Sequence, residues 1–183
     1  MGLFESNAKW KILTFFFENA GSRQYVKGLA RRLKISSGSA STQCKQLFKE
    51  GALRQERQGN SLFYSLDRQN PFVKRLRTAW FLKKLYEFKD AWSASEFQSV
   101  ALYGSYASGE FDEKSDADFL VITSLDKKDV LQRFEQLKKL STEPSLTVFP
   151  LHKWMELAEK HDPFYVEVLA NHVLLHGASI VVS

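Results

Sequence analysis

Two aspartates separated by one residue stand beside an apolar run in the second half of the chain. Asp116 and Asp118 flank Ala117, and Phe119-Leu120-Val121-Ile122 follows them. The apolar run predicts a buried strand. Because side chains alternate along a strand, both carboxylates are expected on the same face. Two carboxylates held so close repel each other unless a cation lies between them. The pair therefore predicts a site for a divalent metal ion.

A glycine–serine pair lies upstream, in the segment Gly104-Ser105-Tyr106-Ala107-Ser108-Gly109. Gly104 permits a tight turn at the end of a strand. We expect Ser105 to begin a helix, whose free backbone N–H groups and hydroxyl can hold phosphate oxygens. A phosphate site beside a metal pair indicates a nucleoside triphosphate. In such a site metal ions neutralise charge on the transferring phosphorus and steady the leaving pyrophosphate.

The spacing of Gly104-Ser105, Gly109 and Ser115-Asp116-Ala117-Asp118 resembles the signature of the DNA polymerase beta nucleotidyltransferase superfamily. It is most similar to the minimal nucleotidyltransferase domains of archaea and bacteria, and the resemblance covers about residues 92–183. It implies that Asp116 and Asp118 are catalytic residues that bind Mg²⁺. It also implies that Gly104 and Ser105 bind the nucleotide phosphates, with Ser115 as a further nucleotide-binding residue.

The sequence departs from that pattern at the third carboxylate, which active members of the superfamily carry on the following strand. Here that strand is predicted over residues 145–149, and Thr147 aligns with the acid. A hydroxyl cannot act as a base at neutral pH and is a weaker metal ligand than a carboxylate. Either Glu143 or another acid completes the site in a shifted geometry, or the domain binds metal and nucleotide with little or no transfer.

Helical periodicity and turn residues organise the first half of the chain. Apolar spacing predicts helices over residues 9–20 and 25–33, and a third helix that starts at Ser36 or Ser37 and ends at Gly51. Ala40, Cys44 and Leu47 form one apolar stripe on this third helix. Segments 52–57 and 61–67 flank Gln58-Gly59-Asn60 and predict a β-hairpin.

This order of three helices and a hairpin resembles winged helix-turn-helix regulators over about residues 8–68. The resemblance implies that the polar face of the third helix lies in the DNA major groove, with Arg54 and Arg57 in or beside the wing hairpin. The alternative is a module that contacts only protein. The predicted contacts from the third helix are Ser37, Ser39, Thr42, Gln43, Lys45 and Gln46.

The remaining elements predict an α+β protein with three parts. These are a winged helix over residues 1–70, a linking helix over 71–90, and a small nucleotidyltransferase-like α/β domain with a mixed sheet over 91–183. In the last part we expect strands over 98–103, 117–122 and 145–149, and helices over 129–140, 153–160 and 164–169.

Charge and composition fit this division. Residues 1–70 hold 12 Lys/Arg against 5 Asp/Glu, whereas residues 91–183 hold 8 against 14. A basic first half favours a polyanionic partner. The single Cys44 excludes an internal disulfide. No apolar stretch approaches the roughly 20 residues of a membrane-spanning helix, so we expect a cytoplasmic protein without membrane contact.

Three functions follow as hypotheses. The first is a DNA-binding protein that transfers a nucleoside monophosphate with Mg²⁺, and a homodimer is expected because winged helices often read paired half-sites. The second is a transcriptional regulator whose nucleotidyltransferase-like domain is a nucleotide sensor or dimerisation platform. The third is an antitoxin-like protein that acts on a partner protein.

Overall fold

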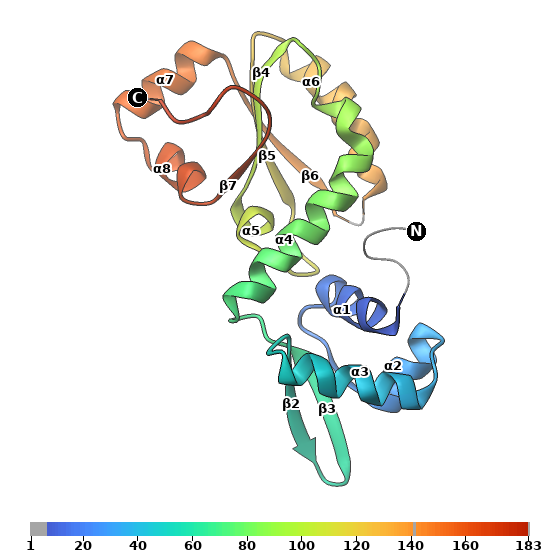
Figure 1. The fold of residues 1–183 in the computed structure, drawn as a ribbon. Helices are drawn as coiled ribbons and strands as arrows, with labels where there is room; N and C mark the ends of the chain where they lie inside the picture. Colours follow the sequence, from blue (N-terminus) through green and yellow to red (C-terminus); the bar gives the residue numbers. More distant parts are fainter. Residues whose placement is uncertain (1–6, 141, 183) are drawn as a thin grey trace. The chain divides into compact units, whose positions relative to one another are not determined.

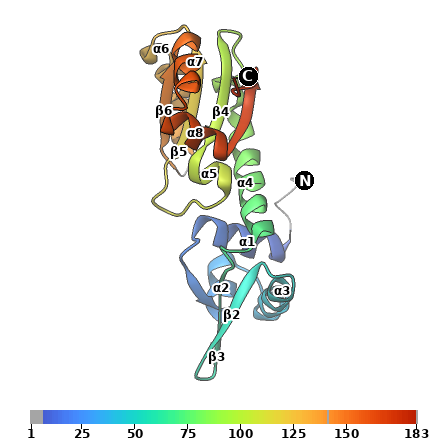
Figure 2. The same cartoon turned by 90° about the vertical axis from the view of Figure 1, so that its left-hand side faces the viewer.

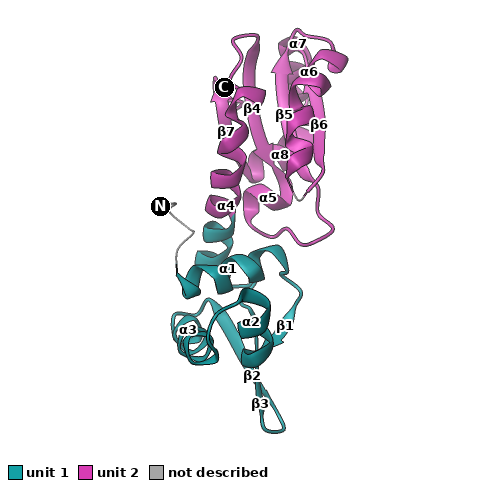
Figure 3. Cartoon of the chain, turned by 90° about the vertical axis from the view of Figure 1, so that its right-hand side faces the viewer, with its two compact units in different colours: residues 1–77 teal, residues 78–183 magenta. Residues whose placement is uncertain are grey.

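The computed structural model describes residues 7–140 and 142–182, and the chain divides into two compact units (Figure 3). Unit 1 comprises residues 1–77 and unit 2 comprises residues 78–183. Both units combine helices with a β-sheet, in agreement with the predicted α+β class (Figure 1). The division falls within helix α4 (Pro71–Leu85). Among the described residues, no helix combines the length and apolar character that a membrane crossing requires.

Unit 1 contains three helices and a three-stranded antiparallel sheet in the order β1-β3-β2. The hairpin predicted around Gly59 is confirmed, and Gly59 supplies the positive φ of 57° that its turn requires. The short β1 was not predicted, because three residues carry no readable alternation. The elements are α1 (Ala8–Glu18), β1 (Arg23–Tyr25), α2 (Val26–Leu33), α3 (Ser37–Lys49), β2 (Leu53–Gln58) and β3 (Ser61–Leu66).

Helix α3 begins where a hydroxyl can cap it. The Ser36 side chain accepts a hydrogen bond from the backbone N–H of Ser39 at 3.1 Å. The predicted stripe of Ala40, Cys44 and Leu47 is buried, so this face of α3 belongs to the core of unit 1. Burial also raises the pKa of the Cys44 thiol to about 11.

Unit 2 is built on a mixed sheet with the strand order β6-β5-β4-β7. β4 pairs antiparallel with β5 and β7, while β5 and β6 are parallel. β7 was not predicted, and the single helix expected over 129–140 is an α-helix followed by a 3₁₀ turn. The elements after α4 are η1 (Tyr86–Ala91), β4 (Phe97–Tyr103), α5 (Gly104–Ser108), β5 (Ala117–Thr123), α6 (Lys127–Phe134), η2 (Glu135–Lys139), β6 (Pro144–Phe149), α7 (Leu151–Glu159), α8 (Pro163–Ala170) and β7 (His172–Gly177).

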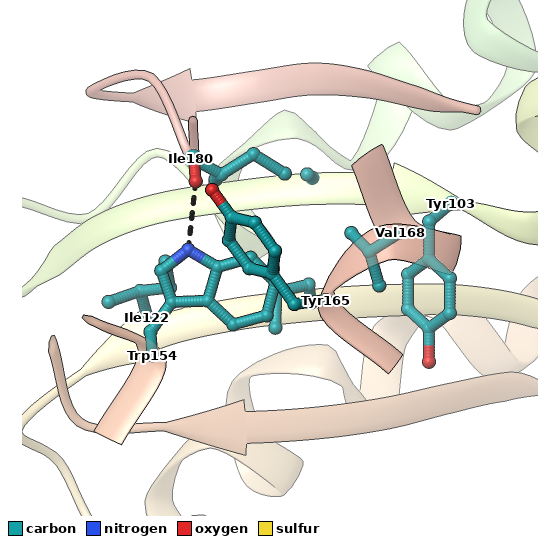
Figure 4. Close-up of a cluster of buried hydrophobic side chains, with 8 residues drawn as sticks. Tyr103, Ile122, Trp154, Tyr165, Val168 and Ile180 are labelled. Carbon is teal, nitrogen blue, oxygen red and sulfur yellow. Dashed lines mark hydrogen bonds between the residues drawn. The ribbon is translucent and has the colours of Figure 1, made fainter. Parts of the chain in front are cut away.

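Helices cover both faces of this sheet. α7 and α8 lie on one face (Figure 2), where side chains of both helices pack against alternate residues of β4 and β5. In this cluster the Trp154 indole donates a hydrogen bond to the Ile180 carbonyl at 2.8 Å (Figure 4). On the other face Phe119 packs edge to face against Phe134, which ends α6, at 5.5 Å between ring centroids. The cluster on the α7–α8 face comprises Ala101, Tyr103, Leu120, Ile122, Trp154, Tyr165, Val168 and Ile180.

Candidate active site

Asp118 lies near the beginning of β5, between the two neighbouring strands. Its register partner on β4 is Tyr103 and its register partner on β6 is Ser145. Two residues further along β5, Leu120 faces the cluster under α7 and α8. Because side chains alternate along a strand, Asp118 is on that same face of the sheet. β5 therefore places this carboxylate at the end of a buried strand, beside a packed apolar core.

The surroundings of Asp118 disfavour its charged form. Burial is the largest cause that raises the pKa of this carboxyl, and the charges of Asp116 and Glu167 raise it further. A hydrogen bond from Ser145 acts in the opposite direction. Asp116 and Glu167 are both carboxylates, so a cation bound beside Asp118 would relieve their repulsion of its negative charge.

Asp116 precedes β5 by one residue and is exposed, while Ala117 between the two aspartates is buried. This pattern agrees with the predicted alternation, and the charge of Asp116 acts on Asp118. Asp116 forms no hydrogen bond or ion pair with the other residues that the structure describes. Its oxygens are therefore available to an external ligand.

Gly104 forms the junction between β4 and α5, where any side chain would be strained. Its φ is +67°, a region that residues with a Cβ rarely adopt. A Cβ at this position would lie 2.9 Å from Oδ2 of Asp118, which is too close for an undisturbed contact. The absent side chain thus leaves the space in which the Asp118 carboxylate lies.

The two serines of the motif have different surroundings. Ser105 is half-buried in the first turn of α5, as predicted, and its carbonyl accepts a hydrogen bond from the backbone N–H of Glu110 at 2.9 Å. The Ser115 hydroxyl donates to Asp112 Oδ1 at 3.1 Å and accepts from the Asp112 backbone N–H at 2.9 Å. Ser115 therefore shapes the turn that leads into Asp116.

β6 carries hydroxyls rather than an acid next to Asp118. Ser145 is the register partner of Asp118, whereas Thr147 lies opposite Leu120. The Thr147 hydroxyl lies 3.2 Å from the Tyr103 hydroxyl, with which it shares a hydrogen bond. Thr147 is thus two residues, or about 7 Å, further along the strand than the residue that pairs with Asp118.

Glu143, the other acid considered from the sequence, precedes β6 and is exposed. It lines a groove of about 1010 Å³ together with residues of α6 and η2. Pro144 and Leu146 of β6 line the same groove, and they alternate with Ser145. This groove is therefore on the face of the sheet away from Asp118.

Sequence reasoning did not identify Tyr103, Ser145 or Glu167, although all three influence the surroundings of Asp118. Their relation to Asp118 depends on strand pairing and on the packing of α8, which no local motif encodes. Among the described residues, no group of three or more His, Cys, Asp or Glu side chains is gathered closely enough to hold a metal ion.

The residues predicted to contact DNA lie on α3 and on the β2–β3 hairpin. Arg57 is exposed near the hairpin turn, whereas Arg54 forms an ion pair with Asp67, 2.9 Å from Nη2 to Oδ1. On α3 the predicted set divides into the exposed Ser37, Thr42, Lys45 and Gln46 and the half-buried Ser39 and Gln43.

Comparisons with known proteins match the second half of the chain. The profile of the nucleotidyltransferase domain family matches residues 83–176. No match was found among curated proteins. Two crystal structures are similar at low identity. One, a toxin-antitoxin with AMP-PNP, shows 19% identity, covers 56% of this chain and 74% of its own, and has a TM-score of 0.37. The other, a mutant of the toxin-antitoxin MntA-HpeT, shows 17% identity with the same coverage and TM-score.

Proposed function

The chain belongs to the nucleotidyltransferase domain family, and from this premise we propose that unit 2 binds a nucleoside triphosphate with Mg²⁺ and transfers a nucleoside monophosphate to an acceptor. The observation that carries the proposal is the position of Asp116 and Asp118 at the start of β5, where Asp118 lies against Gly104, a residue without a side chain. Both carboxylates and the glycine–serine turn thereby meet at one end of the sheet.

The residues present fit a magnesium ion. Mg²⁺ prefers oxygen ligands and is usually held by one or two carboxylates together with substrate phosphates. Asp116 and Asp118 supply these carboxylates, and the missing side chain of Gly104 leaves room at Oδ2 of Asp118. When bound, the ion would neutralise charge on the triphosphate during transfer.

The protein's own groups position the nucleotide. Gly104 and Ser105 would offer backbone N–H groups and a hydroxyl to the phosphate oxygens, and Ser115 would hold the turn before Asp116 in shape. In the transfer, the acceptor hydroxyl oxygen bonds to the α-phosphorus and loses its proton to water, the bond from that phosphorus to the oxygen bridging to the β-phosphorus breaks, and pyrophosphate leaves with the electron pair.

A second candidate is a nucleotide sensor without transfer. It is favoured by the composition of β6, where hydroxyls of Ser145 and Thr147 stand in place of a carboxylate. Without a base near the acceptor hydroxyl, nucleotide binding would not lead efficiently to transfer.

Pyrophosphate release separates the two candidates. Each of the four ribonucleoside triphosphates is incubated with Mg²⁺ and a broad set of acceptors, and nucleotide binding is measured in parallel by calorimetry. Transfer predicts pyrophosphate release that Asp116→Asn and Asp118→Asn abolish, while the exposed Asp129→Asn on α6 serves as a matched control and leaves it unchanged. Mg²⁺-dependent binding without pyrophosphate supports the sensor, and no binding by the wild type refutes both.

For unit 1 we propose a winged helix-turn-helix that binds DNA. The order of α1, α2, α3 and the β2–β3 hairpin supports this proposal, as does the exposed polar face of α3. Lys45 on that face has no ion-pair partner among the described residues, so its charge is available to a phosphate.

DNA binding is tested by selecting sequences from a random duplex library and measuring the affinity of the selected site. Lys45→Ala should weaken binding, whereas Lys128→Ala on α6 of unit 2 removes the same charge elsewhere and should leave affinity unchanged. Equal effects of both substitutions, or no enriched sequence, would contradict a specific interface on α3.

A further inference from the structure

We propose that the outer edge of β6 and the groove beside it bind an extended segment of a partner protein, which joins the sheet of unit 2 as a further strand. β6 is the last strand in the order β6-β5-β4-β7, and among the described residues only β5 pairs with it (Figure 2). The free edge of a sheet carries main-chain groups that another strand can bind. The occupant that fits such an edge is therefore another extended chain.

The register of β6 shows which of its main-chain groups are unpaired. The Glu143 carbonyl accepts a hydrogen bond from the N–H of Ala117 on β5 at 2.9 Å. Main-chain groups alternate between the two edges of a strand, so those of Leu146 and Val148, like the Pro144 carbonyl, point away from β5. In the described part of the chain, none of these outward groups forms a hydrogen bond. An added strand would thus find both donors and acceptors along this edge.

The groove lies beside this edge, on the face of the sheet that α6 covers. Its volume of about 1010 Å³ is at the upper end of the range for ligand pockets, so it can hold several side chains. Leu131 of α6 lines the groove and is 48% exposed. An added strand places every second side chain over the groove, on the face that carries Pro144 and Leu146. Apolar side chains at these positions would cover Leu131. The apolar lining comprises Leu131, Phe134, Leu140, Pro144 and Leu146.

The two ends of the groove carry opposite charges. Because β5 and β6 are parallel, the connection through α6 and η2 returns from the end of β5 to the start of β6. Lys128, in the first turn of α6, therefore lies toward the end of β6, while Glu143 immediately precedes β6. Both line the groove, and neither forms an ion pair with another described residue, whereas Lys138 binds Glu135 at 3.2 Å. A complementary segment carries an acidic residue at the Lys128 end and a basic residue at the Glu143 end.

The pairing direction fixes the order of these charges in the partner segment. Antiparallel pairing is slightly more stable per residue than parallel pairing, so we expect the segment to run opposite to β6. Its first residues then lie near Lys128 and its last residues near Glu143. The expected ligand is therefore an extended segment that has, from its N-terminus, an acidic residue, apolar residues at alternate positions and a basic residue.

The test selects ligands for the full chain from a displayed library of random short linear peptides. A selected peptide is labelled with fluorescein, and its affinity is measured by fluorescence anisotropy. We expect enriched peptides to have the acidic, apolar and basic order. Leu131→Asp should weaken binding by about tenfold or more, because it places a charge in the apolar contact. The matched control Leu151→Asp, on α7, changes a leucine of similar exposure, 44%, and should leave the affinity unchanged.

Two further measurements examine the charges and the main-chain pairing. Lys128→Glu should weaken binding of the selected peptide by about two- to fivefold, and a peptide with lysine in place of its acidic residue should restore the affinity. Methylation of the peptide amides that face β6 removes the donors of the added strand and should abolish binding. Methylation of the alternate amides, which face away from β6, should leave binding intact.

Failure to enrich any peptide would overturn the inference. Equal losses with Leu131→Asp and Leu151→Asp, or equal effects of the two methylation patterns, would do the same. Sedimentation velocity of the chain without peptide examines a second copy as the occupant. We expect Leu131→Asp to leave the oligomeric state unchanged, and a dimer that this substitution dissociates would assign the edge to self-association instead. These outcomes do not depend on Asp116 or Asp118, so the proposed nucleotide site is tested separately.

Discussion

Replacing Gly104 by alanine tests the geometry on which the candidate site depends. The substitution forces a residue with a Cβ into a φ of +67° and places that Cβ 2.9 Å from Oδ2 of Asp118. The left-handed backbone alone costs about 1–2 kcal/mol for a residue other than glycine. The contact adds to this cost unless the carboxylate moves, and a moved carboxylate can no longer lie where the site requires it.

Two matched variants separate these contributions. Gly59→Ala imposes a similar φ, +57°, but its Cβ meets no atom within 4 Å, so it measures the backbone cost by itself. Combining Gly104→Ala with Asp118→Ala removes the carboxylate from the contact. We expect Gly104→Ala to lose more unfolding free energy than Gly59→Ala, and the excess to disappear in the double variant.

Thermal unfolding followed by circular dichroism measures these costs. Each kcal/mol corresponds to a fall of about 4–8 °C in the midpoint for a unit of this approximate size. Mn²⁺ binding by Gly104→Ala should also weaken, by about tenfold. The reasoning would be refuted if Gly104→Ala unfolded no earlier than Gly59→Ala and bound Mn²⁺ as tightly as the wild type.

Four further outcomes are expected. Trp154→Phe leaves the buried Ile180 carbonyl without its donor and should lower the unfolding free energy by about 1–3 kcal/mol, measured by denaturant titration. Asp118→Asn should raise the thermal midpoint at pH 7. The folded-state pKa of Asp118 is raised, so wild-type stability falls as pH rises through that pKa, and the difference should vanish below the unfolded-state pKa. Gly38→Ala, which meets no atom within 4 Å in helix α3, should stabilise unit 1 by about 0.5–1 kcal/mol in thermal unfolding. Arg57→Ala should reduce the slope of log affinity for DNA against log salt by about 1, and an unchanged slope would remove Arg57 from the proposed interface.

Local patterns in the sequence were sufficient for much of the fold. The Gln58-Gly59-Asn60 turn and the flanking alternation predicted the hairpin, and the pair Ser36 and Ser37 marked the start of α3, because each signal acts over a few residues. β7 escaped prediction because its apolar residues follow a helix directly and its pairing with β4 spans most of unit 2. A short run of this kind does not distinguish a strand from the end of a helix.

The candidate site was predictable only in part for the same reason. Asp116, Asp118 and Gly104 belong to one local motif and could be found together. Ser145 becomes the neighbour of Asp118 only through the register between β5 and β6, so the alignment of the strand by itself pointed to Thr147. The charge of Glu167 acts on Asp118 from α8, almost fifty residues later in the sequence, and no local motif in either segment indicates this.

Because Cys44 is buried, the rate of its chemical labelling can report on the opening of unit 1. It is the single cysteine of the chain, and its pKa of about 11 leaves almost no thiolate at neutral pH. A maleimide or iodoacetamide reagent can therefore modify it only after the stripe of α3 has left the core of unit 1. The labelling rate then measures how often unit 1 opens under native conditions, free of any signal from unit 2. A wild-type chain without substitutions is enough to follow the stability of unit 1 as DNA is added.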